Sequence, residues 1–128
     1  VTIDKVKINP NERLTYKGMM LSDVPNFALS FGYVNASWTL RADLTCEYVC
    51  RLINLMDKKG VLCCAPINDE SAYGDDKLID FNSGYFQRGL HMMPKQGNKA
   101  PWKNYQNYLK DIFEINYGKI EDNSLRFS

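Results

Sequence analysis

The sequence predicts a small α+β fold, in which short strands surround one long helix and a second helix follows near the C-terminus. Short apolar runs separated by turn residues indicate the strands. Residues 40–57 have the apolar periodicity of an amphipathic helix, and residues 102–117 show a second such pattern. The 128 residues, of which 45% are hydrophobic, suffice for one small domain with a core but not for two.

Short strands are expected mainly before the long helix. Residues 1–8 alternate weakly between apolar and polar side chains, and residues 14–16 and 19–21 read as strand pieces on either side of Gly18. The apolar run at residues 27–33 predicts a further strand, which leads directly into a polar turn.

The long helix is expected to begin after Asn35-Ala36-Ser37 and to end near Gly60. Asn35, Ser37 and Thr39 are residue types that favour the position before a helix. Gly60 is the residue type that commonly ends one.

The faces of this helix follow from its periodicity. Apolar side chains recur every four residues in one stripe, which Val49 and Ile53 widen: Leu40, Leu44, Tyr48, Leu52 and Met56. Arg41 and Arg51 are expected on the polar side, as in a helix at the protein surface.

The second half of the chain is expected to hold short strands and polar loops. Residues 61–64 have a buried-strand pattern, whereas residues 66–77 are turn-rich and acidic, which indicates a solvated loop. Residues 78–81 and 85–86 are predicted strands, and residues 94–99 are a predicted exposed basic loop.

The second helix is predicted over residues 102–117, with Gly118 placed to end it. Its apolar face is predicted from residues at helical spacing: Trp102, Tyr105, Leu109, Ile112 and Phe113. The aromatic members of this set could also stack nucleic-acid bases, but at helical spacing a core or interdomain role is the stronger interpretation.

Charge and apolar run lengths exclude some classes of partner. The net charge is +1, which argues against nucleic acid and against an anionic membrane surface. No apolar run approaches the roughly 20 residues that span a bilayer. The chain begins at Val1 without an initiator methionine, which fits a piece of a longer protein.

The cysteines do not predict a metal site. Cys46, Cys50, Cys63 and Cys64 lack C-x-x-C spacing, and His91 is the only histidine. We therefore expect four free thiols, buried as small hydrophobic side chains, which suits a reducing cytoplasm.

No G-x-G-x-x-G motif and no P-loop occur anywhere in the chain. These glycine-rich turns hold the phosphates of a dinucleotide at the start of a helix. The chain alone therefore lacks the glycine-rich turn that binds a dinucleotide tightly.

Several segments resemble the C-terminal region of flavin-containing monooxygenases, most closely the Baeyer–Villiger type that activates ethionamide. The central segment is Asn-Ala-Ser-Trp-Thr-Leu-Arg-Ala-Asp-Leu at residues 35–44, preceded by Val-Pro-Asn-Phe at 24–27 and by Gly32-Tyr33. The resemblance continues through residues 47–52. It returns at residues 94–97, 101–102, 106–111 and 118–122, and so covers most of the chain in order.

The resemblance implies a piece of an FAD/NAD(P)-binding fold. Residues 1–60 would be the C-terminal end of the FAD-binding domain, and residues 61–128 a C-terminal extension. The intact enzyme would use FAD and NADPH to oxidise small-molecule ketones, sulfides or similar substrates. Its dinucleotide fingerprints and catalytic residues would lie upstream, so this piece alone should be inactive and should bind neither cofactor tightly.

The candidate cofactor-binding residues are Asn35, Ala36, Ser37, Trp38 and Thr39. In the resembled family the corresponding turn approaches the flavin ring, and a positive helix end favours the charge of reduced flavin. The alternative is an ordinary helix cap with Trp38 as a core aromatic residue, and local physics alone favours it. The resemblance favours the flavin.

Other residues carry weaker indications. His91 is expected to be a surface or structural histidine, because no nucleophile accompanies it. Lys95, Lys99 and Lys103 could bind phosphate but more simply belong to a solvated loop. The resemblance at Lys95-Gln96-Gly97 indicates a specific role that the sequence does not identify.

A second hypothesis is a stand-alone, non-catalytic interaction module derived from the same family, since the chain is short and lacks the glycine-rich turn. If the chain is instead a piece of the enzyme, its partners are the upstream FAD and NADPH domains. The strand at 27–31 and the long helix would then expose apolar area, and we expect the isolated piece to self-associate.

Overall fold

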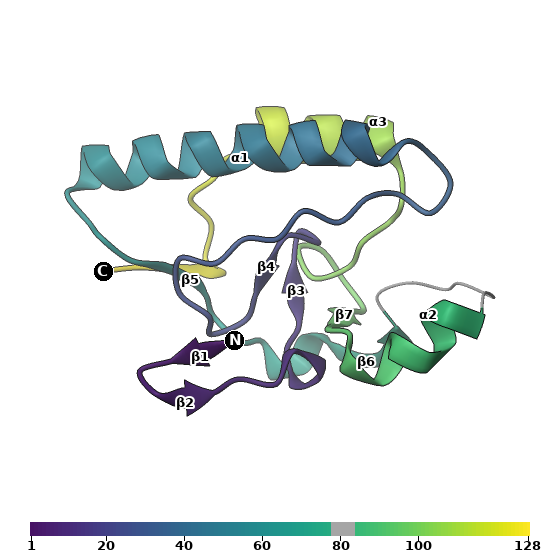
Figure 1. Cartoon of the computed structure of the whole chain (residues 1–128). Coiled ribbons are helices and arrows are strands. Elements are labelled where there is room, and N and C mark those ends of the chain that lie inside the picture. Colours follow the sequence, from purple (N-terminus) through teal and green to yellow (C-terminus); the bar gives the residue numbers. More distant parts are fainter. Residues whose placement is uncertain (78–83) are drawn as a thin grey trace.

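The computed structural model describes residues 1–77 and 84–128. A long helix lies along one side of the molecule, and short strands lie below it (Figure 1). Within these residues the strands form four separate two-stranded sheets. The predicted α+β class is confirmed.

Two small hairpins open the chain. Strands β1 (Thr2–Ile3) and β2 (Val6–Lys7) are antiparallel, and η1 (Pro10–Glu12) follows them. Strands β3 (Thr15–Tyr16) and β4 (Met20–Leu21) are also antiparallel, as predicted on either side of Gly18. Gly18 has a φ of +66°, which a glycine adopts without strain, and a side chain there would meet Arg41 Nη2 at 2.9 Å.

The prediction of a strand at residues 27–33 was wrong. The segment is extended, and its exposure alternates along part of its length, but it belongs to no sheet within the described residues. The Leu29 amide connects it to the β3–β4 hairpin by donating a hydrogen bond to the Met19 carbonyl at 2.7 Å. An apolar alternating run forms a strand only where a second strand lies beside it.

Helix α1 (Trp38–Lys59) has almost the predicted bounds. Gly60 ends it with a left-handed φ of 65°, and the Gly60 amide donates to the Asp57 carbonyl. The buried face contains Leu44, Tyr48 and Leu52, as the periodicity predicted.

Two predictions about the faces of α1 were wrong. Arg41 is buried at 3% exposure, and Ile53, predicted on the apolar stripe, is 52% exposed. Arg51 is half-buried and contacts the segment after the second helix. The buried face of α1 depends on which other elements pack against it. These elements cover Arg41 and leave Ile53 exposed to solvent.

Strands far apart in sequence pair in the second half of the chain. Strand β5 (Cys64–Pro66) is antiparallel to β8 (Leu125–Phe127), and β6 (Tyr73–Lys77) is antiparallel to β7 (Lys95–Gly97). The short helix η2 (Glu70–Ala72) lies between β5 and β6, and α2 (Gly84–Gly89) and η3 (Leu90–Met92) lie between β6 and β7.

Several predictions for this half need correction. The strand expected at 61–64 begins only at Cys64, and Leu62 is 88% exposed. The solvated loop at 66–77 contains η2 and β6, and the basic loop at 94–99 contains β7. Residues 85–86 are helical, and the strand predicted at 78–81 lies outside the described residues.

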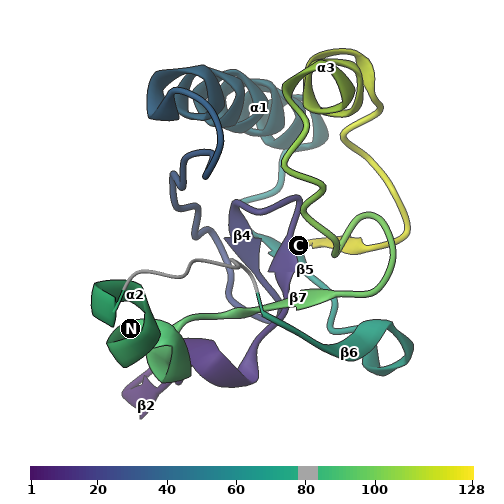
Figure 2. The ribbon, with the colours of Figure 1, turned by 90° about the vertical axis from the view of Figure 1, so that its right-hand side faces the viewer.

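The second helix is shorter than predicted. It consists of α3 (Tyr108–Asp111) and a π-helical turn, η4 (Ile112–Tyr117), and residues 102–107 are not helical. Asn107 caps α3 by accepting a hydrogen bond from the Lys110 amide. Figures 1 and 2 show α3 beside α1, running in the same direction.

The apolar face predicted for this helix was wrong at Tyr105, Leu109 and Phe113, whereas Ile112 packs against the core as predicted. Trp102 is buried at 1% exposure, but it reaches the core from an irregular segment. Leu109 and Phe113 are 69% and 68% exposed, and Tyr105 is also exposed. Ile115 fills the core position instead, because the π-helical turn changes which residues face α1.

The core lies between α1, the β3–β4 hairpin and the C-terminal segment. At its centre the Tyr16 hydroxyl donates to Asp122 Oδ2 at 2.6 Å and lies 3.4 Å from the Tyr48 hydroxyl. Tyr16 also packs edge-on against Trp102, with ring centroids 5.7 Å apart. The core residues are Leu14, Tyr16, Met19, Met20, Leu44, Tyr48, Leu52, Cys64, Ala72, Trp102, Ile115, Ile120 and Leu125.

All four cysteines are free thiols, but the prediction that they are buried holds only in part. Cys64 is buried and Cys63 half-buried, whereas Cys46 and Cys50 are exposed on α1. In the described part of the chain, no helix combines the length and the apolar character needed to cross a membrane.

Candidate functional site

The predicted site is the exposed start of helix α1. Asn35, Ala36, Ser37, Trp38 and Thr39 are all exposed. Ser37 occupies the position before the helix with an extended backbone, but its side chain caps no amide in the described structure. The Ser37 and Thr39 hydroxyls instead contact each other at 2.7 Å. The first amides of α1 are therefore left without a side-chain cap.

Trp38 forms one wall of this site. Its ring is 53% exposed and packs against Phe31, with ring centroids 5.2 Å apart. Gly32 lies directly under the ring, because a side chain at that position would come within 2.2 Å of Trp38 Cγ. Trp38 thus packs against the preceding segment on one side and is about half exposed to solvent, whereas a core aromatic residue would be buried.

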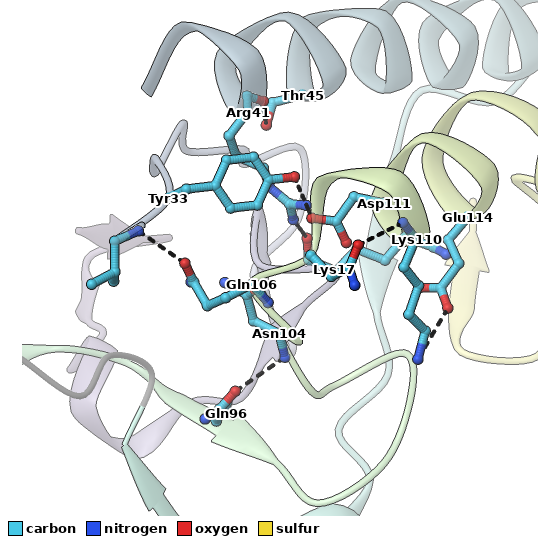
Figure 3. Close-up of polar contacts among 12 residues, drawn as sticks. Lys17, Tyr33, Arg41, Thr45, Gln96, Asn104, Gln106, Lys110, Asp111 and Glu114 are labelled. Carbon is cyan, nitrogen blue, oxygen red and sulfur yellow. Dashed lines mark hydrogen bonds and ion pairs between the residues drawn. The ribbon is translucent and has the colours of Figure 1, made fainter. Parts of the chain in front are cut away.

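A buried ion pair lies beneath the helix start (Figure 3). Arg41 Nη1 donates to Asp111 Oδ2 at 2.6 Å, and the Tyr33 hydroxyl donates to the same oxygen at 2.5 Å. Arg41 Nη2 donates to the Lys17 carbonyl. The two charged side chains are 3% and 9% exposed. Burial, and then the bond to Asp111, raises the pKa of Tyr33 above its usual value.

Hydrogen bonds between amide groups hold the residue just before the turn. The Val34 amide donates to Gln106 Oε1 at 2.9 Å, and the Gln106 amide donates to Asn104 Oδ1 at 3.2 Å. The Asn104 amide in turn donates to Gln96 Oε1 at 3.0 Å. Figure 3 shows this series running from β7 to the segment before α1. Residues 104–106 therefore support the turn from one side.

The series also gives Lys95-Gln96-Gly97 a role. Gln96 accepts the Asn104 amide, and the Lys95 backbone pairs with Arg13. A side chain at position 97 would come within 2.5 Å of Trp102 Cβ and 2.9 Å of the Ala72 carbonyl oxygen. Gly97 is thus the residue that lets Trp102 enter the core beside β7.

The other candidate residues do not join this site. His91 is exposed, as expected, and Lys99 pairs with Asp69 at 3.6 Å on the surface. The other two lysines that could have bound phosphate are Lys95, which lies in β7, and Lys103, which lies over the Tyr105 ring, so each of the three has different neighbours. Among the side chains that the structure describes, no group of three metal-ligating residues comes together.

Sequence reasoning missed Arg41, Asp111, Tyr33 and Gln106 as parts of the site. A signal for Arg41 was present, because it lies three residues before Leu44 and seven before Tyr48, on the buried stripe. Asp111 and Gln106 carried no such signal, since their contacts with Arg41 and Val34 span 70 and 72 residues.

The fold and site define a small α+β unit that presents an uncapped, braced helix N-terminus. Such an end suits an anionic or electron-rich ligand, because its amides and the helix dipole both favour negative charge. A metal centre or a nucleophilic triad would need side chains that this site does not contain.

Comparison with known proteins gives the family. The FAD-containing monooxygenase EthA of Mycolicibacterium smegmatis is 46% identical over 122 residues, which are 95% of this chain and 25% of that protein. The probable FAD-binding monooxygenase AlmA of Acinetobacter baylyi is 42% identical over 127 residues. The putative FAD-containing monooxygenase MymA of Mycobacterium tuberculosis is 38% identical over 127 residues.

The chain belongs with the C-terminal region of these FAD-containing monooxygenases. It spans about a quarter of the length of the curated relatives, 25% or 26% in each case. No model of a protein family matches the chain, and no solved structure does. The resemblance expected from residues 35–44 is confirmed.

Proposed function

We propose that the chain is the C-terminal part of an FAD- and NADPH-dependent monooxygenase, and that the start of α1 faces the flavin. The observation that carries this proposal is the match of 95% of the chain to an FAD-containing monooxygenase. In the intact protein, residues 1–60 end the FAD-binding domain and residues 61–128 form a C-terminal extension. A reducing cytoplasm, which suits free thiols, is the proposed location.

The residues of the turn fit one end of a flavin. The residues at the start of α1 are exposed and no side chain caps its first amides, which favours hydrogen bonds from these amides to the pyrimidine carbonyls of the ring. The residues proposed to hold the ring are Asn35, Ala36, Ser37, Trp38 and Thr39. Bound FAD, reduced by NADPH, supplies the oxygen-activating chemistry that oxidises ketones, sulfides or similar groups.

The segment before the turn supports a larger protein. Residues 27–33 are extended but have no partner strand among the described residues. Exposed backbone amides and carbonyls of such a segment favour pairing with another strand. We propose that the upstream FAD-binding domain provides that strand.

We expect the isolated chain to bind flavin weakly, because most of the binding energy would come from the upstream FAD-binding domain. The pyrophosphate of FAD is gripped by a glycine-rich turn, and this sequence has none. The turn at α1 can contribute one or two amide hydrogen bonds, each worth about 1 kcal/mol net. The chain alone should therefore be inactive and should not retain FAD or NADPH.

The experiment has two arms. Titration of the isolated chain with FAD should leave the flavin fluorescence unchanged, and micromolar binding would contradict this expectation. In the longer FAD-loaded protein, Thr39→Asp should lower the flavin reduction potential, because a carboxylate beside the ring disfavours the reduced anionic form. Asn54→Asp adds the same charge at an exposed position near the far end of α1 and should leave the potential unchanged.

The alternative function is a stand-alone, non-catalytic interaction module of the same descent. The observation that favours it is that the chain encloses a hydrophobic core of its own. The coding sequence upstream of Val1 separates the two readings. Two G-x-G-x-x-G motifs in frame support the monooxygenase, and a start codon at Val1 supports the module.

A further inference from the structure

The buried ion pair between Arg41 and Asp111 lies close to the N-terminus of α1, so its charges can affect the electrostatic potential there. Arg41 follows Thr39 by two residues, so its backbone is about 3 Å further along the axis of α1. Its guanidinium is 3% exposed and is therefore poorly screened by solvent and salt. An unpaired cation there would add to the positive end of the helix.

Asp111 is the carboxylate that opposes this charge. Its Oδ2 atom lies 2.6 Å from Arg41 Nη1 and 2.5 Å from the Tyr33 hydroxyl, so two donors fix its position. Figure 3 shows Tyr33 and Arg41 converging on Asp111 from the segment before α1 and from α1 itself. Asp111 belongs to α3, in the part of the chain after residue 60.

Three other charged groups lie near the pair. Lys17 and Glu114 line the same small polar hollow as Arg41 and Asp111, and a third charged residue, Lys103, lines it as well. Burial lowers the pKa of the Lys17 ammonium, while nearby carboxylates act in the opposite direction. The pair Arg41–Asp111 is the one held by a direct hydrogen bond in this part of the described structure.

We propose that Asp111 is a positioning residue for the flavin: it neutralises Arg41 beneath the helix start and so sets the charge that the ring experiences. This inference rests on the proposed placement of the flavin at the start of α1. Through Arg41, the segment after residue 60 would then influence the reduction potential of the flavin. Asp111 itself touches no cofactor.

Opposite substitutions separate this electrostatic role from structural damage. In the longer FAD-loaded protein, Asp111→Asn leaves Arg41 unopposed, and the flavin reduction potential should shift upward. Arg41→Gln leaves the carboxylate unopposed, and the potential should shift downward. The double variant is neutral again, and its potential should return close to that of the parent protein.

Tyr33→Phe is the matched control. It removes a hydrogen bond to the same Asp111 oxygen without changing any charge, so the potential should stay near the parent value. Circular dichroism identifies variants that remain folded. If Asp111→Asn does not fold because Arg41 is buried unpaired, Arg41→Gln and the double variant still decide the question.

Several outcomes would overturn the inference. Shifts of the same sign in both single variants, or no shift in either, would show that the pair does not set the charge at the ring. A double variant no closer to the parent than the single variants would assign the pair a purely structural role. Failure of Thr39→Asp to move the potential would instead count against the placement of the flavin, and so against the proposed function.

Discussion

Arg51 links α1 to the end of the second helix, and its removal should destabilise the protein measurably. Its Nη2 atom donates to the Gly118 carbonyl at 2.8 Å, and its Nη1 atom donates to the Ile115 carbonyl. These carbonyls lie at the end of the π-helical turn, where the helix supplies no amide partners of its own. Arg51→Met keeps the aliphatic stem and removes both hydrogen bonds.

The magnitude follows from the two bonds. A hydrogen bond that involves a charged group contributes about 1.5–3 kcal/mol. Arg51 is half-buried, so water can replace part of what is lost, and we expect a total loss of about 2–4 kcal/mol in the free energy of unfolding. For a chain of 128 residues this corresponds to a decrease in Tm of about 6–15 °C.

Thermal unfolding followed by circular dichroism measures this loss. Lys58→Met is the matched control, because Lys58 lies on the same helix, is exposed, and makes no ion pair within the described part of the chain. Its Tm should change little, since such surface substitutions alter stability by about 0.5 kcal/mol or less. Equal Tm values for the two variants would refute the role assigned to Arg51.

Three further predictions concern pH, thiols and assembly. Burial raises the pKa of Tyr48 to about 12 and that of Cys64 to about 11, so both stay protonated in the folded protein where the unfolded chain ionises. Stability should therefore be constant to about pH 9 and should fall as the pH rises towards 12 in alkaline melts; constant stability to pH 12 would contradict this. A thiol reagent should label Cys46 and Cys50 rapidly and Cys64 slowly, and the denatured, unreduced protein should yield four thiols, because all four cysteines are free. The isolated chain should self-associate in light scattering, and Phe113→Lys should reduce its mass more than Leu62→Lys, because exposed Phe113, Leu109 and Tyr117 lie together on α3 and η4; a monomeric parent chain would exclude this.

The sequence by itself determined the elements whose causes are local. The four-residue spacing from Leu44 to Leu52, together with Gly60, defined α1 and its end to within a few residues. Gly18 marked the turn of the β3–β4 hairpin because its positive φ is a local requirement. The polar turn at 35–39 was also correctly placed at the start of the helix.

The tertiary structure decided what depends on neighbours distant in sequence. Residues 27–33 have the composition of a strand but no partner among the described residues, so they remain irregular. Trp102 enters the core beside Gly97 from an irregular segment, and the second helix therefore begins only at Tyr108. Cys46 and Cys50 are exposed because no other element covers their side of α1 in the described structure.

The candidate site divides in the same way. The sequence placed residues 35–39 at the start of the helix, since a helix boundary is a local feature, but it did not show that this start lacks a side-chain cap. Nor did it show the charge balance beneath them, because Arg41 and its partner Asp111 lie 70 residues apart. Helical spacing places Arg41 on the buried face, but only the packing of α3 against α1 provides the carboxylate that makes a buried arginine stable there.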